Sequence, residues 1–360
     1  MKKKVILVIV SICIIVGTFF GLQAVFQPKY QTSIFEGNFT ESYYQSNYDH
    51  DVMVIGDCEV YENISPITMY EDYGLTSYIR GNAQQLTWQS YYMLKDALLH
   101  ETPQVVVYSV TALRHGSPMS EAYNRMTLDG MKWSSVKWDA INASKTEGES
   151  TWDYLFPLLR YHSRWSELSS DDITYTFGSK KQTNFNGYLM KSGVEAYKGF
   201  ADPKSLADYT LPSSSMSYLD KIRELCDENG ITLVLMKSPN LNSPYWYAEW
   251  DEQIVNYANK YNLTYLNCIK LADEIGIDYS KDTYNGGYNL NVDGAEKVGS
   301  YLGKVFTEEL KITSKCKNDN SETYWQNLIE AYYNTKDDQQ YELETYGYLK
   351  SYGGTPKEGD

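Results

Sequence analysis

The chain has 360 residues, of which 22% are charged, and its formal net charge at pH 7 is −15. This length allows one large α/β domain or two small ones. The acidic balance disfavours nucleic acid and anionic lipid as partners, because both carry charge of the same sign. We therefore expect a globular protein that does not bind nucleic acid.

An apolar segment follows a lysine cluster near the N-terminus. Residues 2–4 are lysines, and an apolar or weakly polar run extends from Val5 to Gly21 and on to Phe26. About 20 such residues span a bilayer as a helix, and flanking lysines favour a cytoplasmic N-terminus. The sequence predicts a signal anchor over residues 1–27, a single-pass cell-membrane topology and an extracytoplasmic domain. A cleaved signal peptide is the alternative, although no small-x-small cleavage site follows the run.

After a polar and aromatic stalk over residues 28–49, apolar runs alternate with amphipathic stretches. We expect strands at Val52–Ile55, Val105–Val110, Thr232–Met236 and Leu263–Leu266. We expect helices at Thr87–His100, Ser215–Asn229, Glu249–Tyr261 and Gly294–Leu310, with a shorter one between Pro66 and Gly74. Short apolar strands separated by amphipathic helices are typical of a parallel sheet with both faces covered. The sequence therefore predicts an α/β, doubly wound parallel sheet in a domain over residues 50–315.

A long insertion, at about residues 115–212, interrupts this alternation. It is rich in tryptophan, and we expect it to pack over the carboxyl ends of the strands, where α/β folds bind ligands. Arg160, His162 and Arg164 lie in one cluster within it and are candidate substrate-binding residues. Arginine can bind an anionic ligand through two parallel hydrogen bonds, and ordinary ion pairing is the alternative.

The segment over residues 316–360 predicts a helix near Tyr324–Tyr333 and then a fraying tail. Outside the anchor the chain has four cysteines, namely Cys58, Cys226, Cys268 and Cys316. Their wide spacings favour thiols, with a bridge from Cys226 to Cys268 or Cys316 left open. The Cys and His spacings match no zinc motif, and we expect neither a metal nor another cofactor.

The first apolar strand run ends abruptly in Gly56-Asp57-Cys58. Several α/β hydrolytic folds present their attacking atom in this way, because glycine permits a tight turn and the next helix N-terminus lends positive potential. A cysteine thiolate is intrinsically reactive, so Cys58 is a candidate nucleophile. A small buried hydrophobic side chain is the alternative interpretation.

Three ordered blocks, at residues 56–58, 81–82 and 285–297, resemble those of SGNH/GDSL-type hydrolases, and the resemblance spans about residues 50–310. In that superfamily the first block holds a serine nucleophile, a Gly block and an Asn block supply oxyanion donors, and the last block holds an Asp and a His. By position the resemblance assigns Cys58 (nucleophile), Gly81 and Asn82 (oxyanion donors), Asn285 or Gly286 (Asp position) and Asn289 (His position).

The last block also resembles one subgroup of these hydrolases. Leu290-Asn291, followed by Gly294-Ala295-Glu296-Lys297, is similar to membrane-anchored members linked to O-acylation of envelope polysaccharides. The resemblance implies a cell-envelope polysaccharide or an acyl ester as ligand. It also implies a membrane-bound O-acyltransferase as a partner.

Asn289 cannot act as a general base, because an amide does not take up a proton at physiological pH. Two of the four histidines are candidate substitutes or substrate-binding residues: His115 follows a strand at its carboxyl end, and His162 lies in the cluster of the insertion that could roof the site. For both, a structural histidine is the favoured alternative. Of the others, His50 precedes the first strand and His100 closes a helix, so both are expected to be structural. Trp246, in the Tyr245-Trp246-Tyr247 run, is a candidate platform for stacking on a sugar.

Two function hypotheses follow from these substitutions. The first is a catalytically impaired relative that acts in cell-envelope glycan O-acylation. The alternative is an active acyl esterase or acyltransferase with Cys58 as nucleophile. Position 289 favours the first hypothesis.

Overall fold

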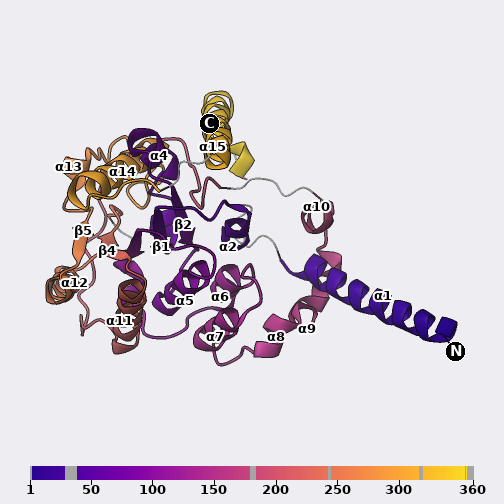
Figure 1. Ribbon diagram of the computed structural model, residues 1–360. Coiled ribbons are helices and arrows are strands. Elements are labelled where there is room, and N and C mark those ends of the chain that lie inside the picture. The colour runs from indigo at the N-terminus through magenta and orange to yellow at the C-terminus, as the bar shows by residue number, and fades with distance from the viewer. Residues whose placement is uncertain are drawn as a thin grey trace.

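A five-stranded, fully parallel sheet forms the centre of the domain (Figure 1). The computed structural model describes residues 2–28, 39–178, 184–241, 245–315, 319–352 and 354. The strands are β1 (Val52–Gly56), β2 (Ser77–Gly81), β3 (Val105–Ser109), β4 (Thr232–Lys237) and β5 (Thr264–Asn267). They lie in the order β2-β1-β3-β4-β5. The order reverses between β1 and β3, which is where doubly wound sheets form their ligand crevice. The predicted fold class is confirmed.

Helices cover both faces of the sheet, because the buried side chains of each strand alternate between the two faces. Val52 and Val54 face one core, and Met53 and Ile55 face the other. The first core is covered by α3 (Cys58–Tyr61), α4 (Pro66–Tyr73), α13 (Ala272–Ile275), α14 (Val292–Lys304) and α15 (Asp319–Tyr346). The second is covered by α5 (Thr87–Ala97), α11 (Ser213–Glu228) and α12 (Ala248–Tyr261).

The remaining elements are short, apart from the N-terminal helix α1 (Lys2–Phe26). Before the sheet lie α2 (Phe39–Ser42) and η2 (Tyr43–Gln45). After β3 come η3 (Val110–Arg114), α6 (Glu121–Leu128), α7 (Ser135–Ser144), α8 (Thr151–Leu155), α9 (Pro157–Tyr161), η4 (His162–Ser166) and α10 (Ser170–Phe177). One π-turn, η5 (Val305–Glu309), extends α14, and η6 (Lys350–Tyr352) follows α15.

Strand β2 is a fifth strand that the apolar runs do not reveal. Its sequence places Arg80 near its end, and a charged residue breaks the apolar pattern. The guanidinium is nevertheless buried, where it donates to Asp96 at 2.9 Å and lies 4.1 Å from the ring centroid of Tyr43. A paired and stacked arginine therefore occupies a core position on this strand.

Two terminal segments contribute more to the domain than predicted. Phe39 and Tyr43 fall in the predicted stalk, yet both are buried in the cores; residues 29–38 lie outside the described residues. At the other end, α15 runs on to Tyr346, well past the predicted Tyr324–Tyr333 helix, and it buries Trp325 completely. Trp325 fixes this helix on the first core, and the helix is longer than predicted.

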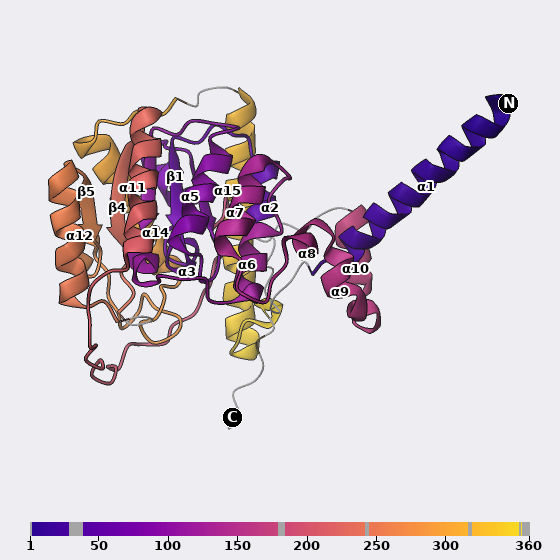
Figure 2. The ribbon, with the colours of Figure 1, turned by 90° about the horizontal axis from the view of Figure 1, so that it is seen from below.

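The long insertion divides into two parts that lie in different places. Its first part, up to residue 178, forms α6 to α10, and the last three of these helices lie at the base of α1, away from the sheet (Figure 2). Its second part first runs beside β2, where Ile79 donates to the carbonyl of Asn186 at 2.9 Å, and from residue 191 it follows the loop before α14. There Val292 donates to the carbonyl of Lys191 at 2.9 Å. Only the second part therefore lies over the carboxyl ends of the strands.

Helix α1 is the one helix among the described residues that is long and apolar enough to cross a membrane. None of its 18-residue apolar window is buried against the rest of the chain. Figures 1 and 2 show it projecting away from the domain, with its C-terminal end at α9 and α10.

Candidate functional site

Cys58 lies immediately beyond the carboxyl end of β1, as the turn motif predicts. Asp57 caps helix α3 by accepting a 3.1 Å hydrogen bond from the backbone N–H of Glu59, and Cys58 is the first helical residue. A Cβ on Gly56 would lie 2.6 Å from Cβ of Ser109. The close approach of β1 and β3 therefore requires glycine at position 56. The turn that follows Gly56 lies at the crevice between these two strands.

A buried ion pair supports this turn from below. Lys237, at the end of β4, donates to both carboxylate oxygens of Glu59 at 2.9 and 2.8 Å. The hydroxyl of Thr111 donates to the same carboxylate at 2.5 Å. All three side chains are buried. The pair joins α3 to two neighbouring strand ends and fixes the position of Cys58.

The electrostatics around Cys58 are set by one buried acid and one cation. Burial and the neighbouring Glu59 carboxylate raise the pKa of Asp57 to about 7, while Arg114 opposes the shift. Burial lowers the pKa of Arg114, although the charges of Asp57, Glu59 and Cys58 act against this. Arg114 is therefore a cation whose charge interacts with Asp57, Glu59 and Cys58.

The Asn285–Asn289 loop folds back onto the nucleophile turn. The backbone N–H of Asn289 donates to Oδ1 of Asn285 at 2.7 Å, and glycines 286 and 287 adopt φ angles of 71° and 98°. The next residue, Leu290, donates its N–H to Oδ1 of Asn63, just after α3, at 2.7 Å. The structure therefore brings the predicted Asp and His positions to the same edge of the sheet as Cys58.

The side chain of Asn289 is held by a neighbouring loop. Its Oδ1 accepts a 2.6 Å hydrogen bond from Nδ2 of Asn240. The Tyr284 hydroxyl donates to Oε2 of Glu62 at 2.7 Å. Burial and the charge of Glu62 raise the pKa of Tyr284, and the charge of Cys58 adds to this shift.

Gly81 and Asn82 lie next to the turn, at the end of β2. Gly81 pairs with Gly56, and a Cβ on it would lie 3.2 Å from the carbonyl oxygen of Asp57. The side-chain amide of Asn82 donates to Thr40 at 3.1 Å and to Gln85 at 3.0 Å. An oxyanion would have to displace one of these partners to reach Nδ2 of Asn82.

The arginine cluster of the insertion lies beside α1 and not over Cys58. Arg160 forms an ion pair with Glu121 at 2.7 Å, and Arg164 donates to the carbonyl of Phe26, the last residue of α1, at 2.5 Å. His162 is exposed on η4. The expectation that this cluster roofs the site is corrected, because α9 and η4, which carry it, pack on α1.

Two further candidates take structural positions. His115 accepts a 2.9 Å hydrogen bond at Nε2 from Arg114, and burial together with that cation lowers the pKa of His115 to about 4. Trp246 is buried against Trp250 and donates to Asp251 at 3.3 Å, so it presents no open ring to a sugar. His115 adjoins the site through Arg114, whereas Trp246 belongs to the second core.

The remaining histidines and cysteines lie away from the site. His50 is buried in an ion pair with Glu101 before β1, and His100 stacks on Tyr48. Cys226 and Cys268 are buried thiols, so the bridge between them does not form; Cys316 lies outside the described residues. In the part of the chain that the structure describes, no cluster of three acidic, His or Cys side chains could hold a metal.

Sequence reasoning missed Glu62, Tyr284, Asn240 and Arg114. Glu62 follows Cys58 by four residues, and its N–H donates to the carbonyl of Cys58 at 3.2 Å. That helical spacing was a readable signal for a carboxylate near the thiol. The other three are brought in by separate loops, and no local pattern marks them.

No family model matches the chain, and no curated protein matches it. Among solved structures it is similar to a protein of Bacteroides fragilis NCTC 9343 provisionally named an acylhydrolase, at 10% identity and a TM-score of 0.36, covering 76% of this chain and 95% of that one. A GDSL-like lipase of Bacteroides thetaiotaomicron VPI-5482 gives 9% identity and a TM-score of 0.35, covering 76% and 99%. These values do not place the chain in a family.

Proposed function

We propose that this chain is a membrane-anchored, extracytoplasmic SGNH/GDSL-like protein with impaired catalysis, which binds an acyl ester or an acylated envelope glycan at the Cys58 turn. One observation carries the proposal. Asn289, at the position of the general base, is an amide whose Oδ1 already accepts a hydrogen bond from Asn240. It cannot accept the proton of Cys58, and general-base catalysis typically contributes about 10² to 10⁴-fold.

No histidine compensates for this loss. His115 is the one that adjoins the site, but its Nε2 is engaged by Arg114 and its pKa is lowered to about 4. A base of such low pKa has little affinity for a proton at neutral pH. In cell-envelope glycan O-acylation, a protein of this kind would hold the acylated ligand for a membrane-bound O-acyltransferase.

The alternative is an active acyl esterase or acyltransferase with Cys58 as nucleophile. It is favoured by the Arg114 guanidinium, whose charge favours a thiolate at Cys58. In this case the thiol would ionise without a base. Gly81 and neighbouring backbone N–H groups would then stabilise the oxyanion.

The reactivity of Cys58 with iodoacetamide separates these functions. The full-length chain, carrying Cys13→Ser to remove the exposed thiol of α1, is alkylated between pH 5.5 and 9, with Cys58→Ser as the matched blank. We expect the Cys58 rate to rise with pH as for an ordinary thiol, whose pKa is about 8.5. Rapid alkylation at pH 6 that disappears in Arg114→Gln would instead establish the activated thiolate and favour the active enzyme.

The membrane topology is part of the proposal. The lysines at residues 2–4 favour a cytoplasmic N-terminus, and the hydrogen bond from Arg164 to Phe26 joins the end of α1 to the domain, as expected for a retained anchor. Protease applied to intact protoplasts should therefore remove the domain. Full protection would show that the orientation is reversed or that α1 does not span the membrane.

A further inference from the structure

The eight tryptophans of the chain fall into two groups. Four are buried in the α/β cores: Trp88, Trp246, Trp250 and Trp325. The other four are 42 to 73% exposed and all belong to the first part of the insertion: Trp133, Trp138, Trp152 and Trp165. Exposed tryptophans are costly in water unless a partner covers them, so their concentration in one segment marks a surface.

Part of this surface encircles the end of α1. We call it the collar. It consists of six apolar side chains from α8, α9, η4, α10 and the residue that joins α8 to α9, namely Trp152, Phe156, Leu159, Trp165, Ile173 and Phe177. Trp165 and Phe177 are 73% and 69% exposed. Trp152 stacks on Phe156 with an interplanar angle of 6°. Trp152 and Phe156 thus form one apolar cluster within the collar.

The collar touches α1 before that helix ends. The ring of Phe156 lies 6.1 Å from that of Phe19, and a Cβ on Gly21 would lie 3.7 Å from Cζ of Phe177. A helix needs about 20 residues to cross a hydrocarbon core about 30 Å thick. Counted from Val5, that length is used up near Ala24. The collar therefore reaches the depth at which α1 leaves the hydrocarbon.

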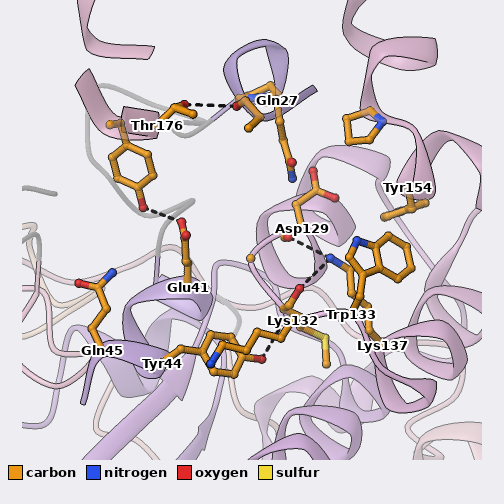
Figure 3. A pocket seen from close by; sticks show the side chains of 16 residues that line it. Gln27, Glu41, Tyr44, Gln45, Asp129, Lys132, Trp133, Lys137, Tyr154 and Thr176 are labelled. Carbon is orange, nitrogen blue, oxygen red and sulfur yellow. Dashed lines mark hydrogen bonds between the residues drawn. The ribbon is translucent and has the colours of Figure 1, made fainter. Parts of the chain in front are cut away.

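Behind the collar, charged and polar side chains occur among aromatic ones. A cavity of about 500 Å³ lies between the end of α1 and the domain, and Figure 3 shows Gln27, Asp129 and Lys137 lining it. Nζ of Lys137 donates to the carbonyls of Asp129 and Met131 at 3.0 and 2.9 Å. At Phe19 and Gly21 the neighbours of α1 are the aromatic Phe156 and Phe177, whereas near Gln27 charged side chains join the aromatic ones, as expected where acyl chains give way to headgroups.

We propose that the collar is a membrane-binding surface whose partner is the outer leaflet of the lipid bilayer. Tryptophan and phenylalanine favour the interface between headgroups and acyl chains, where an aromatic belt anchors a helix. The collar is continuous with α1, and the same bilayer that surrounds α1 covers it. The binding is apolar, because the net charge of −15 gives no general attraction to anionic lipid. This surface rests on α1 spanning the membrane and is independent of catalysis at Cys58.

Quenching of tryptophan fluorescence by brominated lipid tests the collar. The full-length chain is reconstituted into phosphatidylcholine vesicles with bromine near the top of the acyl chains, and its emission is compared with that in unbrominated vesicles. We expect quenching of roughly a quarter of the emission, because Trp152 and Trp165 are two of eight tryptophans. The variant Trp152→Phe/Trp165→Phe should lose most of this quenching, whereas Trp133→Phe/Trp138→Phe should keep it.

Two further measurements keep the test decisive. Protease digestion of the vesicles establishes that α1 is inserted, and the single variant Trp165→Phe serves if the double variant does not fold. Equal quenching in the two double variants, or none with α1 inserted, would overturn the proposal. So would cross-linking of two copies through Trp165→Cys, which would assign the collar to self-association instead of lipid.

Discussion

Asn240 and Asn289, 49 residues apart in the chain, are joined by a 2.6 Å hydrogen bond from Nδ2 of the first to Oδ1 of the second. Asn240 also donates to the carbonyl of Tyr288, and its Oδ1 accepts from Asn63 at 2.7 Å. The loop that carries the His position is therefore fixed to the segment after β4 and to the segment after α3. A side chain introduced at position 289 enters a site whose backbone is already in place.

Asn289→His should increase the hydrolysis of p-nitrophenyl acetate by about 10²-fold, the lower end of general-base effects. An imidazole there can take up the Cys58 proton, but Asn285 cannot orient it as a carboxylate would. Adding Asn285→Asp should raise the rate further and non-additively. Cys58→Ala should abolish the gain. Efficient turnover by the unmodified chain, dependent on Cys58 and on His115 or His162, would contradict the impaired assignment.

Breaking the ion pair under the turn should destabilise the domain. Glu59→Gln or Lys237→Met leaves one buried charge without its partner, which costs about 3–5 kcal/mol in the free energy of unfolding. The double variant should recover much of that loss, because both charges are removed together. Urea denaturation of the three variants measures the coupling. Additive losses would show that the two side chains act separately.

The raised pKa of Asp57 predicts a pH-dependent stability. Its native pKa of about 7 exceeds the unfolded value of 3.8, so the native state holds the proton more tightly between these limits. Stability contributed by this group is therefore present below pH 3.8 and is lost as the pH rises to about 7, by at most about 1.4 kcal/mol per pH unit. Asp57→Asn, which preserves the helix cap, should flatten the profile from pH 4 to 7. Parallel profiles for the two chains would refute this assignment.

Helix α15 should behave as part of the core. Trp325 is fully buried and stacks on Tyr70 at a centroid distance of 4.4 Å, so Trp325→Ala should cost about 3–5 kcal/mol in the free energy of unfolding. Tyr333, on the same helix, is 44% exposed, and Tyr333→Ala provides the matched control with a much smaller loss. Thermal unfolding measures both. Similar Tm values would mean that α15 contributes little to the fold.

The sequence predicts those strands of the sheet that consist of uninterrupted apolar residues. Four strands and the main helices follow from such patterns, and the turn at Cys58 follows from its glycine. Strand β2 does not, because Arg80 is buried only after Asp96 and Tyr43 have folded around it. Local periodicity cannot predict that a charged residue is buried when its partners lie elsewhere in the chain.

The same reason limits what the sequence says about the site. Cys58 and Asn289 are marked by their places in ordered blocks, whereas the link between Glu62 and Tyr284 spans 222 residues and exists only in the folded chain. The aromatic composition of the insertion indicates an apolar surface. This composition does not indicate where the surface lies. In the folded chain α9 and α10 lie against α1, and the part of the insertion that lies over the carboxyl ends of the strands is within residues 184–212.

The hydrogen bond from Arg164 to the end of α1 has a consequence for diffusion. A domain on a loose tether would sample a hemisphere above the membrane. If α1 spans the membrane as proposed, this domain is joined to its anchor twice, through the chain and through α9 to α10. Domain and anchor should therefore rotate as one body about the axis of α1. Cys58 then moves on a ring of fixed height over the bilayer, and it meets only those molecules that the membrane itself holds at that height.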